Sequence, residues 1–80
     1  MLNAPVYSEF KNVLIYSSNN TLYINNLKER TKITCFDISG RIIFENFSEN
    51  NFNKQLSKGI YLIKLENKNG NNQVFKCIVH

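Results

Sequence analysis

The fold of this chain is decided by two runs, KITCFDISGRII at residues 32–43 and LSKGIYLIKL at residues 56–65. In each run, β-branched and alternating apolar residues meet a turn that contains glycine, which is typical of a strand entering or leaving a tight connection. The first run predicts a strand, a Ser39-Gly40 turn and a second strand. The second run predicts a turn at Gly59, which opens the most strongly patterned strand of the chain.

Short strands and turns continue on both sides of these runs. No stretch keeps an apolar period of about 3.6 residues, so we predict no helix. The spacing of the turns predicts an all-β fold, an Ig-like β-sandwich of about seven short antiparallel strands, with a small barrel as the alternative. Residues 1–11 lack a clear period and are expected to form a lead-in or linker with a short edge strand near residues 6–10, so that a single β-sandwich domain spans residues 12–80. The expected strands are residues 12–17, 21–25, 32–38, 41–47, 52–56, 60–66 and 73–79.

Alternation within the strands also predicts which side chains face the core. The weak strand at residues 52–56 is expected at a sheet edge. The residues expected to point inward, or to share one face of the last strand, are Leu22, Ile24, Leu27, Ile33, Cys35, Ile43, Phe47, Phe75, Cys77 and Val79.

Length and composition fit one small globular domain. Eighty residues allow one modest core, and a hydrophobic content of 42% is too high for a disordered chain. The net charge of +4 is dispersed, which favours a solvated surface over a nucleic-acid site. No apolar stretch approaches the ~20 residues of a membrane span and no apolar leader opens the chain. We therefore expect no membrane insertion and, if the module is exported, a longer precursor.

The reactive side chains argue against catalysis, metal binding and cofactors. His80, the single histidine, is the last residue, and neither cysteine has a positioned base. The carboxylates are scattered, and the three glycines lie in separate turns that cannot form a phosphate-binding loop. Cys35 and Cys77 lack metal-ligand spacing. They are predicted to be buried free thiols, and a bridge between them is the alternative if their strands lie close together.

Polar residues at the first turn suggest how its geometry is fixed. Asp37 and Arg41 flank the turn and are expected to form an ion pair across it. Gly40 and Gly59 are expected to adopt backbone angles that other residues resist.

The two runs resemble elements of the C-terminal sorting domains of the bacterial type IX (Por) secretion system, in particular the type A domains. Residues 32–43 resemble its strand, Asp-Leu-Ser-Gly-Arg turn and strand, and residues 56–65 resemble its Leu-x-x-Gly-x-Tyr turn and strand. Residues 73–79, with Lys76, are similar to its lysine-bearing final strand. The resemblance covers residues 12–80, although residues 16–20 stand where the family has a Pro-Asn-Pro-like turn.

This resemblance implies a sorting and anchoring module of a larger secreted or cell-surface protein from a Bacteroidetes bacterium. The implied partners are the outer-membrane secretion machinery and a sortase-like peptidase, with the peptide cut before Val13. We expect the isolated domain to be a monomer. The alternative is a glycan- or protein-binding adhesion module that uses exposed tyrosines. The residues implied in recognition or in the turn signature are Asp37, Ser39, Gly40, Arg41, Lys58, Gly59, Tyr61 and Lys76.

Overall fold

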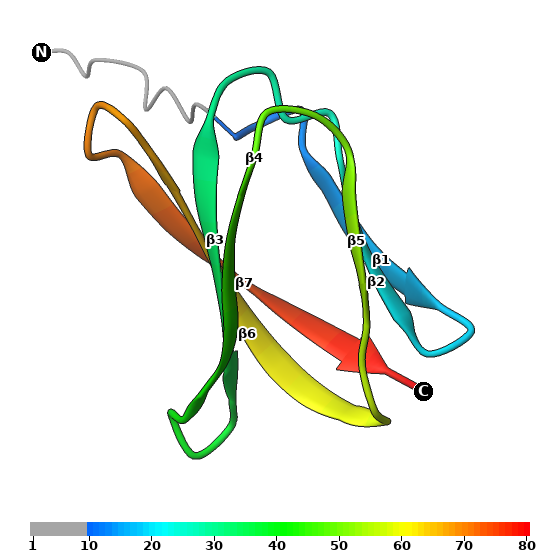
Figure 1. Ribbon diagram of the computed structural model, residues 1–80. Coiled ribbons are helices and arrows are strands. Elements are labelled where there is room, and N and C mark those ends of the chain that lie inside the picture. The colour runs from blue at the N-terminus through cyan, green and yellow to red at the C-terminus, as the bar shows by residue number, and fades with distance from the viewer. Residues whose placement is uncertain (1–9) are drawn as a thin grey trace, which may run out of the picture.

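The computed structural model describes residues 10–80 as seven antiparallel strands in two sheets (Figure 1). One sheet has the strand order β1-β2-β5 and the other has the order β4-β3-β6-β7. One hydrophobic core joins residues of both sheets, so the predicted all-β sandwich is confirmed. The strands are β1 (Leu14–Ser18), β2 (Thr21–Asn25), β3 (Thr31–Asp37), β4 (Ile42–Ser48), β5 (Phe52–Gln55), β6 (Gly59–Asn67) and β7 (Asn72–Val79).

The first segment of the chain is described only in part. The strand expected at residues 6–10 lies outside the described residues except for Phe10, which is in a turn. Phe10 is buried in the core, although the sequence assigned it to a lead-in. Along residues 10–80 no helix is long and apolar enough to cross a membrane.

Asparagines form the tight turn between β1 and β2. Asn19 and Asn20 have φ angles of 51° and 57°, and Ser18 pairs with Thr21 across them. Positive φ at both central residues defines the type I′ turn, whose twist matches that of the flanking strands. Asparagine tolerates this conformation better than most residues do. The hairpin expected from this asparagine-rich connection is confirmed.

The core lies between β2 of the smaller sheet and three strands of the larger one. Alternation in the sequence predicted that most of the core side chains point inward. β5 lies at a sheet edge, as expected. Partly buried aromatic side chains on β4 and β5 close one side of the sandwich, where the rings of Phe44 and Phe52 lie 5.9 Å apart. The most deeply buried apolar side chains are Leu22, Ile24, Ile33, Cys35, Ile63, Leu65 and Val79.

The prediction that Ile43 and Phe47 of β4 point toward the core was wrong, whereas Phe44 is partly covered, as one of the two residues expected to be so. Ile43 and Phe47 are 37% and 55% exposed, whereas Phe44 packs against the core. Phe44 lies opposite the buried Cys35, and directly opposed residues share a face of a sheet. A register shift next to this pair leaves Ile43 without a partner on β3, as in a β-bulge. The extra residue reverses the alternation that the sequence suggested.

Cys35 and Cys77 are buried free thiols, as predicted. They lie on β3 and β7, which flank β6 on opposite sides. Two strand spacings of about 4.8 Å put their backbones about 9.6 Å apart. This separation exceeds the ~7 Å limit between Cα atoms for a disulfide, so the alternative of a bridge is excluded.

Candidate functional site

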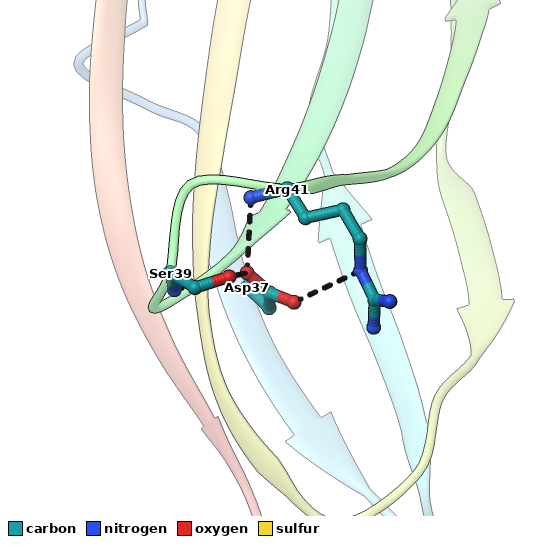
Figure 2. Close-up of polar contacts among 3 residues, drawn as sticks. All are labelled: Asp37, Ser39 and Arg41. Atoms are coloured by element: carbon teal, nitrogen blue, oxygen red, sulfur yellow. Dashed lines mark hydrogen bonds and ion pairs between the residues drawn. The ribbon is translucent and has the colours of Figure 1, made fainter.

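The carboxylate of Asp37 organises the turn between β3 and β4 (Figure 2). Its Oδ1 accepts hydrogen bonds from the Ser39 amide at 2.9 Å, the Ser39 hydroxyl at 2.6 Å and the Arg41 amide at 3.0 Å. Its Oδ2 lies 3.3 Å from Nε of Arg41, which confirms the expected ion pair. The pKa of Asp37 is lowered, first by the Ser39 hydroxyl and then by the Arg41 amide.

Backbone geometry favours glycine at the fourth position of this turn. Gly40 has a φ of 91° and its amide donates to the Asp37 carbonyl at 3.0 Å. The Asp37 amide donates to the Arg41 carbonyl at 2.9 Å and closes the hairpin. A type I turn followed by glycine in the left-handed region forms this kind of hairpin connection.

The turn between β6 and β7 has the same construction with a neutral side chain. Asn67 Oδ1 accepts from the amides of Asn69 at 3.0 Å and Asn71 at 3.1 Å, and Gly70 has a φ of 84°. The turn therefore needs only a side-chain oxygen at its first position, so the charge of Asp37 is an additional feature. Sequence reasoning missed this equivalence, although Asx-x-x-Gly occurs at both places.

The Leu-x-x-Gly-x-Tyr run forms one packed unit. A Cβ at Gly59 would lie 3.6 Å from the ring of Tyr61, so the ring lies directly over this glycine. The Tyr61 hydroxyl donates to the Ser57 carbonyl at 2.8 Å, and burial raises the pKa of Tyr61. Leu56 is buried, and its amide donates to the Asn20 carbonyl at 2.9 Å. These contacts connect the start of β6 to the β1–β2 turn.

Strand register brings the β3–β4 turn and the turn at Gly59 to the same end of the larger sheet (Figure 1). Asp37 pairs with Tyr61 across β3 and β6. Tyr61 also pairs with Cys77, and Gly59 pairs with Val79 near the end of the chain. We call this end, formed by residues 37–41, 57–61 and 77–79, the turn end of the domain.

The candidate residues divide by exposure within the turn end. Tyr61 is 8% exposed and therefore acts through packing, whereas the Arg41 side chain is 77% exposed. Lys58 is exposed beside Gly59. Lys76 lies opposite Leu62, one residue pair further into the sheet, and is also exposed. The turn end can thus present positive charge and hydrogen-bond donors to a partner.

The thiols of Cys35 and Cys77 are both buried. Burial, with smaller effects of Cys77 and Asp37, raises the pKa of the Cys35 thiol to about 11, and burial also raises the pKa of Cys77. Neutral buried thiols are weak nucleophiles at neutral pH. Within residues 10–80 no three histidine, cysteine or acidic side chains gather where they could hold a metal ion.

Comparison with known families identifies the chain. A family model described as a secretion system C-terminal sorting domain matches residues 17–80. These residues include the β3–β4 turn, the turn at Gly59 and all strands from β2 to β7. No curated protein matches the chain. The family is one of sorting signals and is not known for enzymes, and the match gives no support to an adhesion module. The chain therefore belongs to the C-terminal sorting domains of type IX secretion, which are carried by secreted or cell-surface precursors and are recognised by the type IX machinery.

Proposed function

We propose that the secretion machinery reads the turn end of the domain, and that Arg41 and Lys58 make the principal contacts. The observation that carries this proposal is the register of β3, β6 and β7, which gathers both turns and the end of the last strand. A receptor that binds this end contacts segments that are far apart in the sequence. It therefore recognises the folded domain and not a linear peptide.

The residues of the two turns have separate roles in this proposal. Asp37, Gly40, Gly59 and Tyr61 fix the backbone, because their side chains or φ angles are used within the domain. Arg41 contributes only Nε to the ion pair with Asp37, so its terminal nitrogens extend toward a partner (Figure 2). A guanidinium held in this way favours a carboxylate partner, which it binds with two parallel hydrogen bonds.

Lys58 and Lys76 extend the positive charge from Arg41 toward β6 and β7. Both lysines are exposed. Long-range attraction of this kind accelerates association with an acidic surface and weakens as salt is added. We therefore place an acidic patch on the outer-membrane component that receives the domain.

The burial of Phe10 limits where a peptidase can cut the precursor. The precursor, from a Bacteroidetes bacterium, is cut by a sortase-like peptidase once its sorting domain has been recognised. Phe10 is 5% exposed, and its carbonyl accepts from the Val13 amide at 3.0 Å. A peptidase needs accessible backbone, so the cut falls before Phe10. The released domain remains a monomer.

The recognition role is tested by export of a reporter that carries the domain at its C-terminus. Arg41→Gln and Lys58→Gln each remove one exposed charge, and Lys28→Gln makes the same change in the β2–β3 connection, at the opposite end of the larger sheet. We expect the first two variants to accumulate reporter in the periplasm with unchanged thermal stability, and the third to be exported normally. Normal export of an Arg41→Gln, Lys58→Gln double variant would contradict the proposal.

A further inference from the structure

A pocket of about 280 Å³ lies at the end of the larger sheet opposite the turn end. Pairing of Thr31 with both Ser48 and Asn67 places the lining residues around one end of β3, β4 and β6. Its lining is polar and basic around one exposed aromatic ring. We call it the basic pocket, and it is lined by Arg30, Lys32, Phe47, Glu66, Asn67 and Lys68.

The basic pocket has an excess of positive charge. Three of its lining side chains are cationic and one is a carboxylate, which leaves a formal charge of +2. Lys32 is partly neutralised by Glu45, whose Oε2 lies 3.5 Å from its Nζ. For Arg30 and Lys68, no carboxylate lies within ion-pair distance in the described part of the chain. These two charges are available to an incoming anion.

Arg30 is positioned by an aromatic ring instead of by a carboxylate. Its guanidinium carbon lies 4.5 Å from the centroid of the Phe47 ring. Stacking of this kind holds the guanidinium plane while its N–H groups remain free at the edge. Phe47 is 55% exposed, although it is a large apolar side chain. A partner that covers Phe47 would remove this apolar surface from water.

Asn67, at the edge of the basic pocket, has one unsatisfied buried donor. Its Oδ1 accepts two turn amides, while its Nδ2 is buried and has no hydrogen-bond partner within residues 10–80. The residue as a whole is 4% exposed. A buried donor without an acceptor is unfavourable, and native structures contain few of them. Asn67 lies opposite the buried Thr31, on the core-facing side of the sheet, so this donor is not part of the anion site.

We propose that the basic pocket binds a carboxylate side chain of a protein partner, flanked by an apolar residue that packs on Phe47. The net charge of +2 attracts any anion, and the apolar surface around the pocket favours a carboxylate carried by a protein. The outer face of the same sheet also carries the exposed apolar side chains of Ile43, Leu62 and Val74. An exposed apolar face beside a charged pocket is typical of a protein interface and not of a sugar site. The proposal does not depend on the recognition role of Arg41 and Lys58.

The probe is the peptide acetyl-Leu-Glu-Leu-amide, titrated into the isotope-labelled 80-residue chain and followed by NMR. The matched control is acetyl-Leu-Gln-Leu-amide, which differs only in the charge of the central side chain. We expect saturable shifts in the Arg30 Nε–H and in the backbone amides around Lys68 with the acidic peptide alone. Arg30→Gln and Lys68→Gln should each weaken binding about tenfold, as expected for one charge-assisted hydrogen bond, while Lys54→Gln, on β5 of the smaller sheet, leaves binding unchanged.

Several results would overturn this assignment. Equal shifts with the two peptides would mean that no carboxylate is recognised. Shifts that persist in an Arg30→Gln, Lys68→Gln double variant would place binding elsewhere. Saturable binding of glucuronate or inorganic phosphate, with none of the acidic peptide, would replace the protein partner by a different anion.

Discussion

The hydroxyl of Tyr61 provides a quantitative test of how the Leu-x-x-Gly-x-Tyr run holds β6. Tyr61→Phe removes this hydroxyl and leaves the ring over Gly59. The lost interaction is the hydrogen bond of 2.8 Å from Tyr61 to the Ser57 carbonyl. The substitution therefore separates the hydrogen bond from the packing of the ring.

The expected magnitude follows from the burial of this hydrogen bond. A neutral intramolecular hydrogen bond contributes about 0.5–1.5 kcal/mol to stability. Tyr61 is buried but Ser57 is exposed, so water can partly replace the lost donor at the carbonyl. We expect a loss of about 1 kcal/mol, which lowers the thermal midpoint of a domain of this size by about 4–8 °C.

The assay is urea unfolding followed by tyrosine fluorescence, because the chain contains four tyrosines and no tryptophan. Tyr16→Phe is the matched control: Tyr16 is 44% exposed, and its hydroxyl accepts a hydrogen bond of 3.3 Å from the partly buried Asn25. The control should change the free energy of unfolding by less than about 0.5 kcal/mol. If Tyr61→Phe is no more destabilising than Tyr16→Phe, the packed-unit interpretation of this run is wrong.

The remaining predictions concern the two glycine turns, the acid limb of stability and the thiols. Gly40→Ala and Gly70→Ala should each lower the free energy of unfolding by about 1–2 kcal/mol, because both glycines have a φ near 90°, although open space surrounds them. Asn at the same positions should be less destabilising in thermal unfolding, because it tolerates positive φ. Equal losses for Ala and Asn would exclude backbone strain as the cause. The folded-state pKa of Asp37 is below its unfolded value of about 3.9, so its contribution to stability is present above that pH and is lost as the pH falls through the folded pKa. Asp37→Asn should therefore reduce the fall in the free energy of unfolding at acid pH. It should leave the turn intact, as Asn67 does in its own turn. The same fall in the variant as in the wild type would contradict this prediction. Cys35 and Cys77 should show no mass change on reduction. They should react with a thiol reagent at pH 8 only after urea is added, because both are buried and their pKa values are raised. Rapid reaction of the native chain would show that the thiols are accessible.

Sequence alone predicted the regular parts of the fold because local patterns determine them. β6 alternates without interruption, so one face is buried from Tyr61 to Asn67. Its neighbours in the core followed from the same period of two. The turns were equally local, since glycine and asparagine tolerate positive φ and mark where the chain reverses. The pairing of Asp37 with Arg41 needed only their positions around a tight turn.

Other features depend on contacts that a linear pattern does not record. The bulge on β4 exposes Ile43 and packs Phe44 against the core, and it is determined by the pairing of Phe44 with Cys35. Phe10 belongs to the core because long-range packing gives it a place there, although its flanking residues have no period. The basic pocket combines segments near residues 30, 47 and 67, which become neighbours only when β3 pairs with β4 and β6. The turn end likewise combines segments that become neighbours only when β6 pairs with β3 and β7.

Export of a passive reporter tests the sorting function most directly. The reporter carries a cleavable signal peptide and residues 1–80 at its C-terminus, and it is expressed in a bacterium with a working type IX system and in a matched strain without that system. We predict that the reporter reaches the cell surface or the medium only in the first strain, and that the same reporter without residues 1–80 remains in the periplasm of both. A folded fusion protein that stays in the periplasm of the competent strain would contradict the assignment.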